Sequence, residues 1–231
     1  MIKYILSLIL LAVLIIPTDL AVAQTNFEGK IKFKITHDDD IMFLDYFIKE
    51  QNLRMEMGEN QEAVFIKTDG KSLVLMPEQK QYMDLDNSLF SKLPGMTGMN
   101  KGKEDEEEIK DVDFEKFRTG KTMTILEYEC AQWIIKDEEE KDEVEAWVTD
   151  ELGNFMLMSS PMGGGFSPGW SSNVKNNGFF PLLVISRDED GEETSRFEAT
   201  EVKEQSLNND LFGPPSDFTE FQVPGMKGLF K

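Results

Sequence analysis

Cysteine and histidine are nearly absent, with one residue of each in 231. The lone cysteine, Cys130, cannot form an intramolecular disulfide, which excludes a disulfide-stapled scaffold. A catalytic thiol would need His37 in direct contact with Cys130. His37 lies in an expected polar turn, whereas Cys130 lies in an expected apolar strand beside Ala131 and Trp133. Cys130 is therefore interpreted as a small inert core residue and His37 as a surface residue.

Long hydrophobic runs are also scarce, since only Ile5–Ile16 forms one. Lys3 precedes this run, Pro17 ends it, and Ala21-Val22-Ala23 follows as a small-x-small cleavage pattern. The run is too short to span a bilayer comfortably, which is typical of a secretory signal. Residues 1–23 are thus predicted to be a cleaved signal peptide.

The mature chain is then expected to begin at Gln24, with no cysteine beside the cleavage site for a lipid anchor. Residues 24–231 suit a single β-rich domain with a flexible tail from about 219. No later apolar run is long enough for a membrane span. The sequence predicts a periplasmic or secreted protein without stable membrane insertion and with an undetermined oligomeric state.

Positive charge is the third scarcity, because 24 Lys and Arg residues stand against 44 Asp and Glu, for a net charge of −20. Such a chain should repel nucleic acid and anionic lipid headgroups, so neither is expected as a partner. Solubility explains the charge more simply than a specific cationic partner does.

What the chain does have is a series of short apolar segments separated by turn residues. Phe27–Thr36 alternates apolar and polar residues, which indicates a strand with one buried face, and Ile41–Ile48 is apolar at nearly every position, which indicates a strand covered on both faces. Asp69-Gly70 and Asp190-Gly191 predict hairpins. Roughly ten strands without βαβ alternation predict an antiparallel sheet. Asn87 and Asp150 are the expected N-caps of one or two short helices.

Four motifs resemble a bacterial envelope family known as domain of unknown function 4412. They are Tyr128–Trp133, Glu145–Thr149, Phe180-Pro181-Leu182 and Phe212–Pro215, and the resemblance covers roughly Phe27 to Phe218. Relatives often have glycine at the position of Glu127. The layout is similar to the superfamily of periplasmic lipoprotein carriers. That similarity implies a single strongly curved antiparallel sheet, a half-barrel around a hydrophobic cavity with short helices closing the open side, and no catalytic residues.

Acidic runs offer candidate cation sites. Asp188-x-Asp190-Gly191 partly matches a calcium loop, but its glycine comes too early and no carboxylate holds the closing position, so a hairpin turn explains it better. Glu104–Glu108 and Asp137–Asp142 are interpreted as solvated surface. We therefore expect no metal and no cofactor. Hydrolysis by a pair of carboxylates stays open, although no pair stands out.

Methionines gather in regions without regular structure. They are Met96, Met99, Met156, Met158, Met162 and Met226. Three readings remain: gap filling in ordinary loops, an adaptable apolar surface, or copper(I) ligation by thioethers. Phe166 and Trp170 lie in a glycine-rich loop, where large aromatics gain little unless they dock against a surface.

The predicted ligand-binding residues are therefore Met96, Met99, Met162, Phe166 and Trp170, at the opening of an apolar cavity. The predicted function is that of a periplasmic binding or carrier protein for a lipid or acyl chain, without enzymatic activity. The alternative is an envelope module that binds another protein through sheet edges or Met-rich loops. An enzyme is the third possibility.

Overall fold

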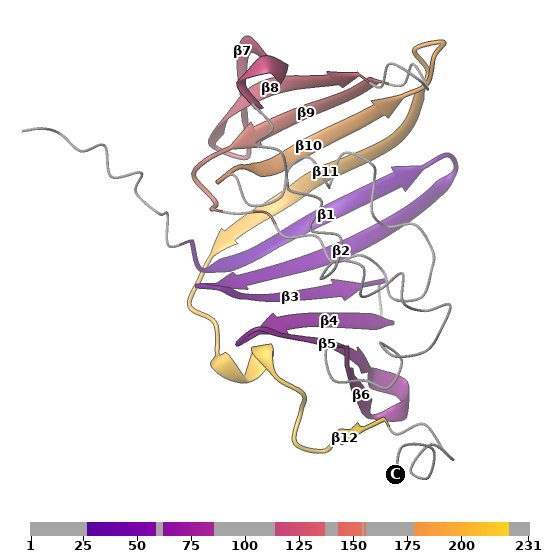
Figure 1. Cartoon of the computed structure of the whole chain (residues 1–231), viewed down its shortest axis with the longest axis vertical. Helices are drawn as coiled ribbons and strands as arrows, with labels where there is room; N and C mark the ends of the chain where they lie inside the picture. The colour runs from indigo at the N-terminus through magenta and orange to yellow at the C-terminus, as the bar shows by residue number, and fades with distance from the viewer. Residues whose placement is uncertain are drawn as a thin grey trace, which may run out of the picture.

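The computed structural model describes residues 27–58, 62–85, 114–136, 143–153, 155 and 178–221. These residues form one open, curved 12-stranded sheet (Figure 1). Its first six strands are β1 (Gly29–His37), β2 (Asp40–Lys49), β3 (Asn52–Met57), β4 (Ala63–Thr68), β5 (Lys71–Met76) and β6 (Gln81–Asp84). The others are β7 (Arg118–Ile125), β8 (Tyr128–Lys136), β9 (Glu143–Thr149), β10 (Phe180–Arg187), β11 (Glu193–Glu204) and β12 (Thr219–Glu220).

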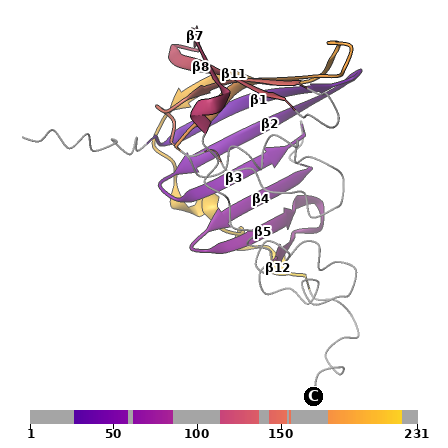
Figure 2. The ribbon, with the colours of Figure 1, turned by 45° about the horizontal axis from the view of Figure 1, so that its top comes forward.

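Two strand series meet in the middle of the sheet. The order is β12-β6-β5-β4-β3-β2-β1-β11-β10-β9-β8-β7, so β1 pairs with β11 although they are far apart in sequence. All pairings are antiparallel except that of β12 with β6. Strands β7 and β12 lie at opposite ends and do not close a barrel (Figure 2). The predicted single curved, mainly antiparallel sheet is confirmed, with β12 as an unexpected parallel addition.

Helical structure in the described residues is limited to 3-10 turns, at η1 (Pro77–Gln79), η4 (Phe114–Phe117) and η5 (Asn209–Phe212). The helix expected after Asn87 lies outside the described ranges. Of the helix expected after Asp150, residues 151–152 form a turn. No helix in the described part of the chain has the length and hydrophobicity needed to cross a membrane.

Two hairpin turns use backbone conformations that L-residues rarely adopt. Asp69 and Gly70 have φ of 45° and 74°, so the predicted β4–β5 turn is confirmed. Leu126 and Glu127 have φ of 48° and 75° in the β7–β8 turn. The position where the family often has glycine thus keeps the glycine-type conformation with a glutamate in it.

One face of the sheet carries the main core, and we call it the aromatic face. Cross-strand partners set its rows, such as Ile31 opposite Tyr46 and Phe33 opposite Leu44. Their side chains are 2% exposed or less. The alternation predicted for Phe27–Thr36 is confirmed, because Lys30, Lys32 and Lys34 lie on the opposite face.

The opposite face is covered at β2–β5 by residues 205–221, which we call the C-terminal strap. Leu207 and Phe212 of the strap pack into a second apolar cluster with five sheet residues. Those residues are Phe47, Val64, Ile66, Leu73 and Leu75. The strap therefore buries the second face of these strands.

The prediction for Ile41–Ile48 is correct for one half of the strand and wrong for the other. Leu44 to Ile48 are mostly buried, but Ile41, Met42 and Phe43 are exposed by 58%, 36% and 45%. The reason is the register: β3 ends at Met57, which pairs with Leu44, so β2 extends past its neighbour.

Candidate functional site

The five predicted ligand-binding residues lie outside the described part of the chain. They are Met96, Met99, Met162, Phe166 and Trp170. Met156, Met158 and Met226 lie outside it as well. The prediction for these residues therefore stays a prediction, and the candidate site is built from the sheet.

Aromatic rings fill the centre of the aromatic face. Phe33 of β1 stacks on Phe197 of β11, with ring centroids 4.3 Å apart. Phe155 meets Phe180 edge to face at 5.1 Å and stacks on Tyr46 at 5.6 Å. Such ring pairs add about 0.5–1.5 kcal/mol each beyond the burial of their area. The centre of this face is thus a packed core.

The same face continues toward β5 with less cover. Met57 pairs with Ala63, and Phe65 pairs with Val74, so these side chains extend the rows of the aromatic face. Met57, Ala63 and Val74 are only partly buried, although they pack against the core. The aromatic face therefore has a solid centre and an apolar flank on β3–β5 that solvent reaches.

Cys130 and His37 do not form a nucleophile with its base. Cys130 is fully buried on β8, and burial raises the pKa of its thiol to about 11. The His37 side chain is 70% exposed at the end of β1, where its Nε2 lies 3.8 Å from the Asp38 carboxylate. The geometry agrees with the interpretation of Cys130 as an inert core thiol.

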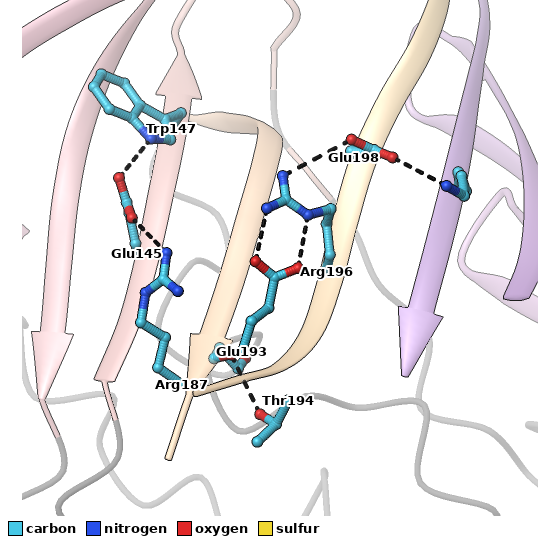
Figure 3. A network of polar contacts seen from close by, with 9 residues as sticks. Glu145, Trp147, Arg187, Glu193, Thr194, Arg196 and Glu198 are labelled. Carbon is cyan, nitrogen blue, oxygen red and sulfur yellow. Dashed lines mark hydrogen bonds and ion pairs between the residues drawn. The ribbon is translucent and has the colours of Figure 1, made fainter. Parts of the chain in front are cut away.

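A polar network crosses strands β9, β10, β11 and β1 on the face opposite the aromatic cluster (Figure 3). Arg196 makes two hydrogen bonds to the carboxylate of Glu193, at 2.8 and 2.7 Å. The Arg196 guanidinium lowers the pKa of Glu193, and Glu193 in turn raises the pKa of Arg196. Glu145 accepts from the indole N–H of Trp147 at 2.9 Å and lies 3.6 Å from Arg187. These groups are mutually satisfied and hold the strands together.

An open groove of about 950 Å³ lies beside the C-terminal strap. Its walls are the β2–β3 turn, the β4–β5 turn and strap residues 209–216. Lys49, Glu50, Asp69 and Asp210 make much of the lining polar or charged. An acyl chain would find little apolar area here, so the groove does not serve as the predicted hydrophobic site.

The acidic turn between β10 and β11 uses its carboxylate internally. Asp188 Oδ1 accepts from the backbone N–H groups of Asp190 and Glu192, at 3.0 and 2.9 Å. The turn reading of Asp188-x-Asp190-Gly191 is confirmed. Within the described residues, no group of three or more His, Cys, Asp or Glu side chains is arranged to hold a metal ion.

Sequence reasoning did not find two features of the sheet. Arg54 and Glu56 form a buried ion pair beneath the strap, with Nε 2.7 Å from Oε1. In the sequence they look like the solvent-facing residues of an alternating strand. The exposure of Ile41–Phe43 was not predictable either, because in the sequence these residues continue the apolar run of the buried half of β2.

Comparison with known families decides the family. A model described as domain of unknown function (DUF4412) matches residues 27–218. The chain belongs to this family. The match confirms the identification made from the Tyr128–Trp133, Glu145–Thr149, Phe180–Leu182 and Phe212–Pro215 motifs. No curated protein matches the sequence significantly.

Several solved structures resemble the chain at low identity. PNGF-II is 14% identical with a TM-score of 0.43. The match covers 85% of this chain but only 31% of the length of PNGF-II. MucB in the Pseudomonas aeruginosa MucA/MucB complex is 9% identical with a TM-score of 0.48, over 86% of this chain and 59% of that one. A Vibrio parahaemolyticus domain, described as one of an outer membrane lipoprotein-sorting protein, is 8% identical with a TM-score of 0.28 and coverages of 79% and 87%.

Proposed function

We propose that this DUF4412 protein is a periplasmic or secreted binding protein that carries a hydrophobic ligand such as a lipid or acyl chain, without catalytic turnover. The export part of the proposal rests on the signal pattern of residues 1–23. The ligand part rests on the aromatic face.

One observation carries the proposal: the apolar flank of the aromatic face is incompletely covered. Met57, Ala63 and Val74 continue the rows of the core but remain partly exposed. An acyl chain lying along this flank would remove apolar area from water at about 25 cal/mol per Å². Met96, Met99, Met162, Phe166 and Trp170 are proposed to complete the opening, because adaptable thioethers and large aromatics suit a ligand of variable shape.

Titration of delipidated mature protein with a fluorescent fatty acid tests the proposal. We expect saturable, stoichiometric binding. Val74→Ser should raise the Kd about threefold to tenfold, because a half-covered valine contributes on the order of 1 kcal/mol. Trp170→Ala should weaken binding at least as much.

The matched control is Ile41→Ser, which also removes an exposed apolar side chain but on the opposite face and on a different strand end. It should leave the Kd within twofold. A flat titration with the wild-type protein would remove the carrier proposal. Equal losses in Val74→Ser and Ile41→Ser would show that binding is not located on the aromatic face.

A further inference from the structure

The end of the β1–β2 hairpin exposes a run of large apolar side chains. Ile41, Met42 and Phe43 are consecutive and 58%, 36% and 45% exposed. The other exposed large apolar residue of the described ranges, Leu126, stands alone in a turn. Single exposed apolar residues are common on protein surfaces, whereas a group of neighbouring ones is a candidate interaction surface. We call Ile41–Phe43 the hairpin patch.

The hairpin patch lies on a strand edge. Strand β2 continues to Asp40, whereas its partner β3 ends opposite Leu44, so the hairpin reaches past β3 (Figure 2). Among the described residues no strand pairs with β2 at 40–43 on that side, where the Gly58 N–H donates to the Phe43 carbonyl at 3.1 Å. Ile41 and Phe43 alternate with Met42 and therefore lie on one face. An extended peptide could pair with this edge and cover both side chains.

Carboxylates lie at the tip of the hairpin and on its β1 side, and Lys34, which stands opposite Phe43, is itself within 3.7 Å of Glu198. Asp38, Asp39 and Asp40 precede it, and all three are exposed. The β10–β11 turn lies beside them, since the Asp38 N–H bonds the Thr194 carbonyl at 3.3 Å, and it contributes residues 188–190 and Glu192. The neighbouring Arg196 is engaged by Glu193 and Glu198. The local field is therefore strongly negative, and it disfavours anionic lipid while favouring cationic groups.

We propose that the hairpin patch binds an extended segment of a partner protein in which apolar residues alternate with lysine or arginine. The apolar residues would cover Ile41 and Phe43, the backbone would add to the edge of β2 that no described strand pairs with, and the cationic side chains would face Asp38–Asp40 at the hairpin tip. Ile41 and Phe43, which form this site, lie on the face opposite the aromatic face, because they pair with Thr36 and Lys34. It is an interaction surface in addition to the proposed ligand site.

Fluorescence anisotropy with a rhodamine-labelled (Lys-Val)₄ peptide tests the proposal on the full mature protein. We expect saturable binding that Phe43→Ser and Ile41→Ser each weaken by fivefold or more. Leu126→Asn, the matched control at the far edge of the sheet, should bind within twofold of wild type. An Asp39→Asn/Asp40→Asn variant should weaken binding and flatten its dependence on NaCl. Circular dichroism melts confirm that each variant is folded.

Two peptide controls separate the chemical contributions. A (Lys-Ser)₄ peptide keeps the charge and a (Glu-Val)₄ peptide keeps the apolar residues, and both should bind at least tenfold more weakly than (Lys-Val)₄. Equal binding of (Lys-Ser)₄, or an unchanged Kd in Phe43→Ser, would overturn the proposal. Two further results would also overturn it: concentration-dependent dimers lost in Phe43→Ser would assign the patch to a second copy, and Phe43-dependent binding to phosphatidylglycerol vesicles would assign it to a membrane.

Discussion

Two charged residues show how position in the sheet changes the role of a side chain. Arg54 and Glu56 lie beneath the C-terminal strap, and their side chains are 11% and 8% exposed. Arg54 also donates to the Leu211 carbonyl at 3.0 Å, so it ties the strap to the sheet. Arg196 and Glu193 form a similar pair with about a third of each side chain exposed. Breaking the buried Arg54–Glu56 pair is therefore expected to lower the stability of the protein far more than breaking the exposed Arg196–Glu193 pair.

Arg54→Met should destabilise the protein by about 3–5 kcal/mol, because it leaves Glu56 buried without its cation. Arg54→Met combined with Glu56→Leu should recover much of that loss, since no uncompensated charge remains. Arg196→Met is the exposed control and should cost no more than about 1 kcal/mol. Urea denaturation measures all three. Similar losses for Arg54→Met and Arg196→Met would contradict the burial argument.

Glu127 adopts a backbone conformation that suits glycine better than glutamate. Its φ of 75° is costly for an L-residue and free for glycine. Glu127→Gly should therefore stabilise the protein by about 0.5–1 kcal/mol, after the greater unfolded-state entropy of glycine is subtracted. Glu129→Gly, placed in strand β8, should instead destabilise it. Thermal melts distinguish the two variants. A lower melting temperature for both would contradict the idea that Glu127 is strained in this turn.

At the scale of elements, the C-terminal strap decides what the second face of the sheet does. Leu207 and Phe212 close the cluster over β2–β5, and polar anchors hold the strap at intervals. Lys49 donates to the Leu207 carbonyl at 2.6 Å, and Lys80 lies 2.8 Å from Asp217. Without the strap, Phe47, Val64 and Ile66 would face water. The strap therefore completes a fold that the sheet alone leaves half covered.

Phe212→Ala should cost about 3–5 kcal/mol of unfolding free energy, as expected for a fully buried phenylalanine. Phe218→Ala is a useful control within the same strap, because Phe218 is only half buried. It should cost clearly less. Chemical denaturation gives both values, and equal costs would indicate that the strap does not anchor through Phe212.

The strap should also respond to acid. The Leu207 N–H bonds the Glu28 carboxylate and, with Lys49, lowers the pKa of Glu28 below its usual 4.5. A carboxyl with a lowered pKa in the folded state stabilises it above the unfolded pKa and loses that effect as pH falls through the folded value. Glu28→Gln should thus be less stable than wild type at pH 7, with the difference shrinking below about pH 4.5. Melts between pH 3 and 7 test this, and a difference that grows in acid would refute it.

At the scale of the whole molecule, charge and topology dominate. A net charge of −20 repels itself in the compact state. Raising NaCl from 20 to 500 mM should increase the urea midpoint, because the Debye length shrinks from roughly 20 Å to a few Å. Choline chloride at the same ionic strength should act alike, which separates screening from sodium binding. An unchanged midpoint would mean that local ion pairs already offset the repulsion.

Local patterns in the sequence were sufficient for much of this fold. Period-two alternation predicted β1, and Asp69-Gly70 predicted the β4–β5 turn, because each depends only on neighbouring residues. The family motifs gave the single curved sheet. The same reasoning wrongly predicted that Ile41–Phe43 of β2 are buried, since the apolar run does not reveal where β3 ends. It also placed the candidate site in segments outside the described residues, so that site stays a prediction.

What the sequence determined by itself is the β class and the hairpin turns, because these follow from short-range periodicity and from residues that tolerate positive φ; the export signal stays a prediction. The tertiary structure alone decided that β1 pairs with β11, that the strap buries Arg54 and Glu56, and that Ile41–Phe43 remain in solvent. Each of these depends on which distant segments meet and where a neighbouring strand stops. No local pattern records that information.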